Sequence, residues 1–316
     1  MNKISIIVPC YNEEDVINSF YIEITKTLIS DMQHSDYEIL FIDDGSTDST
    51  YRIICELANK DNHVHYISLS RNFGKESAMY AGLSYADGDY TVIMDADLQH
   101  PPKYISEMYK LMQEEDIDMV ATRRKSRGNE SKFASFFSES FYKLMNKISG
   151  IDISNNAMDF RMLNKKARNA IVNLPEYNRF SKGIFEWIGF KTHWLEIEIN
   201  DRAAGQSKWS FAKLFAYAIE GCVAYSTLPL HLSSILGIVF CVVAFVMIIV
   251  MVVQTIVYKD FGSGYATIIC LMLLIGGIQL FCLGILGQYL AKDYLENKKR
   301  PIYLVRDSSK ELEVDR

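Results

Sequence analysis

Two aspartates separated by one residue, Asp95 and Asp97, directly follow the strand-forming run 90–94. In an extended segment, residues two apart project to the same side, so the two carboxylates point the same way. Like charges held that close are unfavourable unless a cation lies between them, and carboxylate oxygens suit Mg²⁺ or Mn²⁺. Such an ion would bridge to a diphosphate. A D-x-D sequence alone is more often a solvated turn, but the position after a buried strand favours the metal interpretation.

Two further polar clusters each follow an apolar run. The acidic cluster 43–48 holds more polar side chains than a turn and helix cap require, and its carboxylates can accept hydrogen bonds from a base N–H and ribose hydroxyls. The cluster 71–75 carries Arg71 and Lys75, which can meet a phosphate. An ordinary turn and an ordinary solvated loop remain the alternatives for these two segments.

The elements that must position these clusters alternate between short apolar runs and helical patterns. The expected strands are 4–8, 37–42, 65–69, 90–94 and 119–122, and the expected helices are 15–30, 50–59, 75–86 and 102–115. This alternation is typical of an α/β fold with an open, mostly parallel sheet covered by helices on both faces. Ligands of such sheets bind at the carboxyl ends of the strands. The polar clusters, with residues 9–14, therefore converge on one edge. Beyond them we expect a helix at 133–148 and a strand at 159–163.

Two uncharged apolar runs near the C-terminus, 232–257 and 265–291, are each long enough to span a bilayer, which needs about 20 residues. The short connection between them makes a transmembrane hairpin, whose two ends face the same side. Basic residues after the second run, among them Lys298-Lys299-Arg300, place that side in the cytoplasm. The segment 208–225 before the hairpin is amphipathic. It is either a packed surface helix or, as its position favours, an interfacial helix.

The composition excludes other classes of protein. A formal net charge of -6 over 316 residues argues against a general nucleic-acid binder. The six cysteines show no metal-binding spacing and are expected to be reduced. The predicted organisation is a cytoplasmic domain (1–205), an interfacial helix (206–229), two transmembrane helices within 230–292 and a cytoplasmic tail (293–316).

Four segments in order, 6–14, 41–48, 70–75 and 94–101, resemble family-2 glycosyltransferases of the GT-A fold, a Rossmann-like architecture. The match is closer to bacterial polyprenyl-phosphate glycosyltransferases, which include bactoprenol glucosyltransferases and relatives of dolichol-phosphate mannose synthase. The resemblance extends over the whole chain, hairpin included. It implies that Pro9, Tyr11, Glu13 and Asp44 hold the nucleotide, while Asp95 and Asp97 bind a metal and the diphosphate. With the clusters above, the expected donor-binding set is Pro9, Tyr11, Glu13, Asp43, Asp44, Arg71, Lys75 and Asp95.

The resemblance also implies residues for the chemical step. The segment 156–161 is similar to the one that carries the family's catalytic aspartate, which falls on Asp159; many relatives have Gly where this chain has Met158. Residues 202–208 resemble the R-x-x-G-x-S-K segment assigned to a substrate phosphate, so Arg202 and Lys208 join Asp159 and Asp97 in the set expected to serve catalysis. Further candidate cations for the two anionic substrates are Arg123, Arg127, Arg179 and Lys182, of which the first two can equally attract anionic lipid.

The resemblance implies inverting transfer of one sugar, glucose or N-acetylglucosamine, from a UDP-sugar to undecaprenyl or another polyprenyl phosphate at the cell membrane. The lipid-linked sugar would serve modification of cell-envelope glycans, with a separate flippase and an outer-face glycosyltransferase as partners and a homo-oligomer allowed. The Q-x-x-R-W motif of processive synthases is absent, which favours transfer of a single sugar. The alternatives are a GDP-mannose-dependent mannosyltransferase and, from another class, a non-catalytic membrane scaffold or translocator subunit. Because a phosphate monoester has a second pKa of about 6, Asp159 is expected to orient the substrates more than to remove a proton.

Overall fold

The computed structural model describes residues 2–31, 36–125, 157–199, 227–258 and 264–310. The chain divides into two compact units: Met1–Trp209 together with Arg300–Arg316, called the α/β unit below, and Ser210–Lys299, called the helical unit. The predicted helix 133–148, residues 206–226 of the predicted interfacial helix, and Arg127, Arg202 and Lys208 lie outside the described residues, and the predicted end of the interfacial helix, 228–229, belongs to α9.

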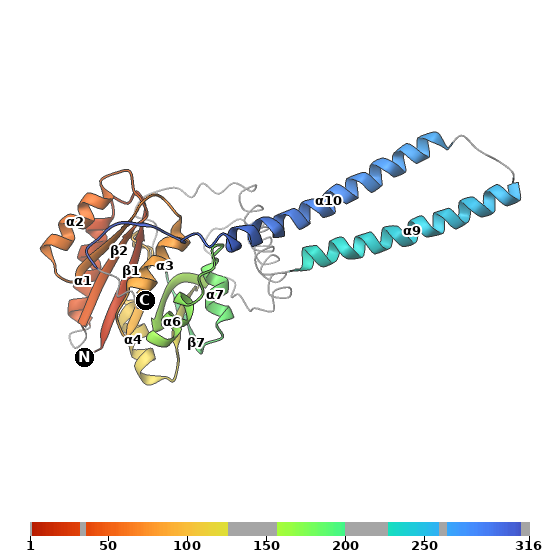
Figure 1. Ribbon diagram of the computed structural model, residues 1–316. Helices are drawn as coiled ribbons and strands as arrows, with labels where there is room; N and C mark the ends of the chain where they lie inside the picture. The colour runs from red at the N-terminus through yellow and green to blue at the C-terminus, as the bar shows by residue number, and fades with distance from the viewer. Residues whose placement is uncertain (1, 32–35, 126–156, 200–226, 259–263, 311–316) are drawn as a thin grey trace. The chain divides into compact units, whose positions relative to one another are not determined.

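The α/β unit is built on an eight-stranded sheet in the order β7-β5-β6-β4-β1-β2-β3-β8. Figure 1 shows β1 and β2 side by side within this sheet. The pairs β1–β2, β1–β4, β2–β3 and β5–β7 are parallel, whereas β6 is antiparallel to β4 and β5, and β8 is antiparallel to β3. The strands are β1 Lys3–Cys10, β2 Asp36–Asp43, β3 Val64–Leu69, β4 Tyr90–Ile93, β5 Met119–Arg124, β6 Ala157–Asn164, β7 Thr192–Ile197 and β8 Val305–Ser308.

Helices cover both faces of this sheet, as the alternating pattern predicted. The helices are α1 Ile17–Asp31, α2 Thr50–Lys60, α3 Lys75–Tyr85, α4 Tyr104–Glu114, α6 Lys165–Val172 and α7 Ser181–Trp187. Successive side chains of β1 enter different cores, because strand residues alternate between faces. Ile6 packs in the core with α1, α2 and α4, and Ile7 packs in the core with α3, α6 and α7. Both cores are dominated by aliphatic residues at zero or near-zero exposure.

Helix α3 approaches the sheet unusually closely. A Cβ atom on Gly82 would lie 2.2 Å from Cγ2 of Ile7 in β1, so no larger side chain fits there without displacement of the helix. This close packing fixes the first residue of the helix, Lys75, next to the carboxyl ends of the strands.

The helical unit consists of α9 Leu228–Tyr258 and α10 Tyr265–Asn297, which run side by side (Figure 1). Their most apolar segments, Pro229–Met247 and Leu274–Asn297, have mean hydropathies of 2.4 and 1.6, and neither is buried within the protein. Large apolar side chains such as Phe245 and Leu280 are 65% and 71% exposed. A helix of a soluble core would bury such residues, so length, composition and exposure together fit the predicted spans. The second helix continues beyond the expected end at residue 291.

The tail contains an element that the sequence did not predict. The segment 293–316 is predicted as a cytoplasmic tail, and within it α10 continues to Asn297 and Val305–Ser308 forms β8 at the edge of the sheet.

Candidate active site

The predicted clusters meet around one hollow of about 330 Å³ at the carboxyl edge of the sheet. It collects residues that follow β1, β2, β3 and β4, the arrangement expected from a parallel sheet. Six of the eight expected donor-binding residues line it, as does Asp97, whereas Asp43 and Arg71 do not. The lining residues are Pro9, Cys10, Tyr11, Glu13, Asp44, Asn72, Gly74, Lys75, Ala78, Asp95, Ala96 and Asp97.

The loop after β1 is fastened to the turn after β2 by hydrogen bonds between side chains and backbone. The Asn12 amide donates to Ser46 Oγ at 3.0 Å, and Asn12 Oδ1 accepts from the Thr47 amide at 2.9 Å. The Glu13 amide donates to Thr50 Oγ1 at 2.8 Å. These bonds fix the backbone beside Tyr11 and Glu13, so one wall of the hollow is held in place without a ligand.

Asp44 links this wall to the cluster that follows β3. Its carboxylate is 3% exposed and accepts hydrogen bonds from the amides of Phe73 and Gly74 at 2.7 and 2.8 Å. Burial raises the pKa of Asp44, although both amide bonds and Arg71 oppose the shift. The carboxylate is therefore a fixed acceptor at the junction of two loops.

Asp43 and Arg71 occupy different positions from those expected. Asp43 has no exposed surface, and its carboxylate accepts from the Ser46 amide at 3.0 Å and from Ser68 Oγ at 2.6 Å. Arg71 donates to the Asn72 carbonyl at 3.2 Å, and its guanidinium carbon lies 4.3 Å from the centre of the Phe73 ring. In this structure both side chains shape the loops around the hollow.

Lys75 connects two carboxylates that come from different strands. Its Nζ lies 2.7 Å from Asp95 Oδ1 and 2.8 Å from Asp159 Oδ2. Asp95 follows β4 and Asp159 belongs to β6, so Asp159 is brought to the hollow although it is distant in sequence from the other clusters. Sequence reasoning selected Lys75 as a phosphate ligand and did not foresee this bridge.

The ion pair sets the ionisation of Asp159. Burial by itself would raise the pKa of Asp159, but the charges of Lys75 and Lys182 and the hydrogen bond from Lys75 outweigh it and hold this pKa at about 2. Conversely, the pKa of Lys75 is raised: burial lowers it, and the carboxylates of Asp95 and Asp159 more than compensate. Asp159 is therefore an anion, and Lys75 a cation, throughout the neutral range.

Asp95 and Asp97 suit a divalent cation that is shared with a substrate. Within the described ranges no group of three His, Cys, Asp or Glu side chains could hold a metal by itself. Mg²⁺ is commonly bound through one or two carboxylates plus substrate phosphates, so a full protein cage is not required. Both carboxylates line the hollow, and the ammonium group of Lys75 contacts both oxygens of Asp95.

Three buried or part-buried residues close in sequence to Lys75, Asp97 and Asp159 were not among the predicted site residues. His100 stacks on Phe160 with ring centres 5.3 Å apart, and Arg161 is fully buried with its guanidinium carbon 3.6 Å from the centre of the Phe185 ring. The Glu76 carboxylate accepts from the amide and the hydroxyl of Ser181, which ties α3 to α7. The only sequence signal for these residues is their proximity to Lys75, Asp97 and Asp159.

Comparison with known proteins gives matches over nearly the whole chain. The family described as "Glycosyl transferase family 2" matches residues 5–172. CsbB of Bacillus subtilis (strain 168), which carries the provisional name of glycosyltransferase, is 42% identical over 306 residues, 97% of this chain and 92% of that protein. The bactoprenol glucosyl transferase of Shigella phage SfX is 38% identical over 304 residues, 96% of this chain and 99% of that protein.

Among solved structures, glucosyl-3-phosphoglycerate synthase from Mycobacterium tuberculosis is 17% identical, with a TM-score of 0.49 over 70% of this chain and 78% of that chain. That likeness is too distant to bear on the donor or the metal.

Proposed function

Because the chain belongs to glycosyl transferase family 2 and is a glycosyltransferase, we propose that it transfers one sugar from a UDP-sugar to a polyprenyl phosphate at a membrane. The observation that carries the proposal is the single hollow that joins Asp44, Lys75, Asp95 and Asp97, with Asp159 bridged to it by Lys75. In the hollow, Asp44 is a fixed hydrogen-bond acceptor for a nucleoside. The carboxylates of Asp95 and Asp97 suit a cation, and Lys75 suits a phosphate.

The acceptor assignment is supported by the relatives and by the helical unit. The alignment with a bactoprenol glucosyl transferase covers 96% of this chain, so it extends beyond the α/β unit. The exposed apolar surfaces of α9 and α10 suit residence in a bilayer, where a polyprenyl phosphate is also held. A membrane anchor keeps the enzyme in the same layer as its lipid acceptor.

In the proposed reaction, an oxygen of the acceptor phosphate forms a bond to C1 of the sugar, and the bond between C1 and the diphosphate breaks. Displacement in line inverts C1, and the nucleoside diphosphate leaves with the bonding electrons. Mg²⁺ or Mn²⁺ at Asp95 and Asp97 would supply positive charge next to the leaving diphosphate.

The residues of the chain bind and orient the two substrates. Asp44 accepts from the nucleoside end, and Lys75 offers its ammonium group to anionic oxygens near Asp95. Asp159, with a pKa of about 2, is a weak base, and the acceptor phosphate is largely dianionic at neutral pH because its second pKa is about 6. We therefore assign Asp159 an orienting role. Arg202 and Lys208 remain proposed ligands of a substrate phosphate.

We place the α/β unit on the cytoplasmic side of the cell membrane, where nucleotide sugars are available. The sugar is proposed to be glucose or N-acetylglucosamine, and the product would be moved outward by a separate flippase and used by an outer-face glycosyltransferase. A GDP-mannose-dependent mannosyltransferase is the nearest alternative within the family.

The decisive experiment incubates the purified full-length protein with undecaprenyl phosphate, Mg²⁺ or Mn²⁺, and radiolabelled UDP-glucose, UDP-N-acetylglucosamine or GDP-mannose in parallel. We expect label in the organic phase from one UDP-sugar and none with Asp97→Asn, because that variant loses a metal ligand. Label only from GDP-mannose would select the alternative. No label from any donor, together with unchanged function of Asp97→Asn in cells, would indicate a non-catalytic scaffold.

A further inference from the structure

The chain returns from α10 to the sheet of the α/β unit. Residues 304–310, called the tail clasp below, lie along β3: the Ser70 amide donates to the Leu304 carbonyl at 2.8 Å, and the Ser309 amide donates to the Tyr66 carbonyl at 3.0 Å. Between these points β8 pairs antiparallel with β3. The tail clasp therefore runs from the carboxyl edge of the sheet, where the hollow lies, toward the opposite edge.

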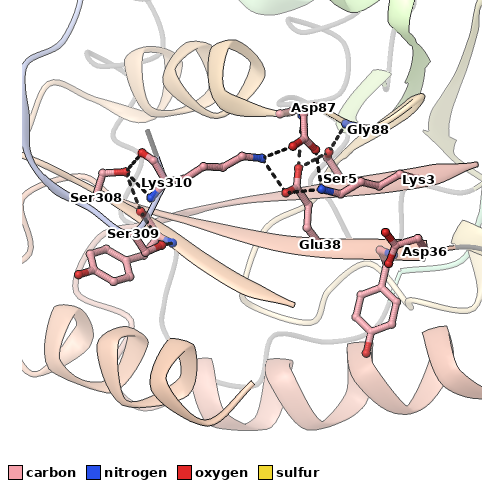
Figure 2. Close-up of polar contacts among 12 residues, drawn as sticks. Lys3, Ser5, Asp36, Glu38, Asp87, Gly88, Ser308, Ser309 and Lys310 are labelled. Carbon is pink, nitrogen blue, oxygen red and sulfur yellow. Dashed lines mark hydrogen bonds and ion pairs between the residues drawn. The ribbon is translucent and has the colours of Figure 1, made fainter. Parts of the chain in front are cut away.

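At the far end, Lys310 pairs with the buried carboxylate of Glu38 and with the exposed carboxylate of Asp87. Figure 2 shows its ammonium group between Glu38 and Asp87, at 2.7 Å from Glu38 Oε2 and 3.1 Å from Asp87 Oδ2. Glu38 is 1% exposed, and Lys3 is its second cationic partner at 3.2 Å. A buried carboxylate is costly without cationic or hydrogen-bonding partners, so Lys310 anchors the tail clasp to the start of the sheet.

At the near end, Arg306 reaches the buried Asp43. Its Nη2 donates to Ser68 Oγ at 2.8 Å and lies 3.5 Å from Asp43 Oδ2, while Ser68 Oγ itself donates to that oxygen at 2.6 Å. The guanidinium carbon also lies 4.7 Å from the centre of the Tyr51 ring. In the described part of the chain, Arg306 is the basic side chain that forms an ion pair with Asp43.

The other oxygen of Asp43 accepts from the Ser46 amide and so closes the turn after β2. Ser46 in turn accepts from the Asn12 amide, and Asp44 within the same turn lines the hollow. A chain of contacts thus runs from the tail clasp through Arg306 and Asp43 to the wall of the hollow. Every link is a hydrogen bond or an ion pair of at most 3.5 Å.

We propose that Arg306 is a positioning residue for the nucleotide donor, acting through Asp43 on the turn that carries Asp44. The inference rests on the proposed use of the hollow as the donor site. It makes the tail clasp a functional part of the donor site. It predicts that loss of the tail clasp weakens donor binding, although none of the residues 304–310 lines the hollow.

The test compares full-length variants by titration with UDP in the presence of Mg²⁺ and by steady-state kinetics. For Arg306→Ala we expect about tenfold weaker UDP binding and an equal rise in the donor KM, the effect of about 1.4 kcal/mol of lost interaction, with kcat nearly unchanged. Arg306→Lys should recover most of the affinity, because it keeps a positive charge and a donor. The matched control is Arg52→Ala, which removes an exposed cation of α2 that pairs with Glu56 on the same helix and should leave the donor KM unchanged.

Wild-type affinity of Arg306→Ala, or an equal loss in Arg52→Ala, would overturn the assignment. A double-mutant cycle adds a second criterion: in an Asp43→Asn background, where the buried charge is gone, Arg306→Ala should cause little further loss. If Arg306→Ala does not fold, Arg306→Gln serves in its place, because it removes the charge and can still hydrogen-bond to Ser68.

Hydrogen exchange of the Ser46 amide separates this inference from the proposed function. Arg306→Ala should accelerate exchange at Ser46 whether or not the protein binds UDP, because the bond from that amide to Asp43 is weakened. If the wild-type protein neither binds UDP nor transfers sugar, the donor assignment fails. Unchanged exchange at Ser46 would refute the link through Asp43 itself.

Discussion

Lys75 places one positive charge between the carboxylates of Asp95 and Asp159. Without that charge, two acidic side chains from neighbouring strands would face each other beside a third, Asp97, and repel. A divalent ion and an anionic donor would bring further charges to the hollow, and we expect the ammonium group of Lys75 to contact the donor diphosphate as well. This dual role follows from its position at the start of α3.

The Lys75→Met variant tests this role. We expect at least a hundredfold fall in kcat/KM, corresponding to roughly 3 kcal/mol, because substrate anions lose a charge-assisted partner and Asp159 loses the interaction that orients it. Lys75→Arg, which keeps the charge, should retain more activity than Lys75→Met. Initial rates of the three proteins measured at saturating acceptor check the ranking. Equal activity of Lys75→Met and wild type would show that the bridge is incidental.

The pH dependence of the chemical step follows from Asp159. Its pKa is about 2 in the folded protein, below the ordinary value of 3.8, so the carboxylate is ionised at every pH above about 4. The ionised carboxylate stabilises the fold, and this stabilisation is lost as the pH falls from about 4 to about 2. We therefore expect a single-turnover rate that is flat above about pH 7. In Lys75→Met the burial of Asp159 is less opposed, its pKa rises, and the acidic limb should move to higher pH. A wild-type rate that rises steeply above pH 7 would instead identify a general base.

The turn between β2 and α2 shows how an element constrains the site. Gly45 has φ +69°, and a Cβ atom there would lie 2.4 Å from the backbone carbon of Arg71, so the turn and the loop after β3 touch backbone to backbone. Both the positive φ of Gly45 and the close approach of the Arg71 backbone exclude a side chain at this position. Non-glycine residues avoid positive φ, and a backbone atom cannot rotate out of the way as a side chain can.

We expect Gly45→Ala to destabilise the protein by about 1 kcal/mol for the backbone conformation and by a further 1–3 kcal/mol or so for the clash. It should also weaken UDP binding, because the displaced loop carries Asn72 and Gly74 of the hollow. Gly189→Ala is the matched control: Gly189 has φ +65°, but its nearest neighbour would be 4.0 Å from the new Cβ, so it should show the conformational cost alone. Thermal unfolding and UDP titration in detergent compare the two. Identical behaviour would contradict the steric argument.

The sequence could predict those elements whose conformation follows from a local pattern of residues. Strands β1 to β4 are short, mainly apolar runs that end in polar clusters, and this local pattern located both the strands and most of the hollow. β8 has the sequence Val305-Arg306-Asp307-Ser308, which carries no apolar periodicity. Its strand conformation depends on pairing with β3, more than two hundred residues earlier in the chain. The bridge from Lys75 to Asp159 escaped prediction for the same reason, because it depends on the antiparallel placement of β6 beside β4.

At the scale of the whole molecule, the order of the elements along the chain restricts how the protein can be oriented in a membrane. The chain leaves the α/β unit, forms α9 and α10, and re-enters the same sheet as β8. If α9 and α10 each cross a bilayer once, both ends of the pair must lie on the side that holds the α/β unit. The positive charges Lys298, Lys299 and Arg300 follow α10 directly and favour the cytoplasmic side, so sheet pairing and charge both support the cytoplasmic orientation that we propose.

Reporter insertions test that orientation in bacterial cells. Alkaline phosphatase inserted between α9 and α10 should be active, because the connection would lie outside the cytoplasm, while green fluorescent protein at the C-terminus should fluoresce. Exchanging the reporters should silence both, which controls for expression. Replacing Lys298, Lys299 and Arg300 by glutamine should shift the balance of orientations only slightly, because β8 must still reach β3 for the α/β unit to complete its sheet. An externally accessible C-terminus on folded, active protein would be incompatible with that pairing, since the tail clasp cannot join the sheet from across a membrane.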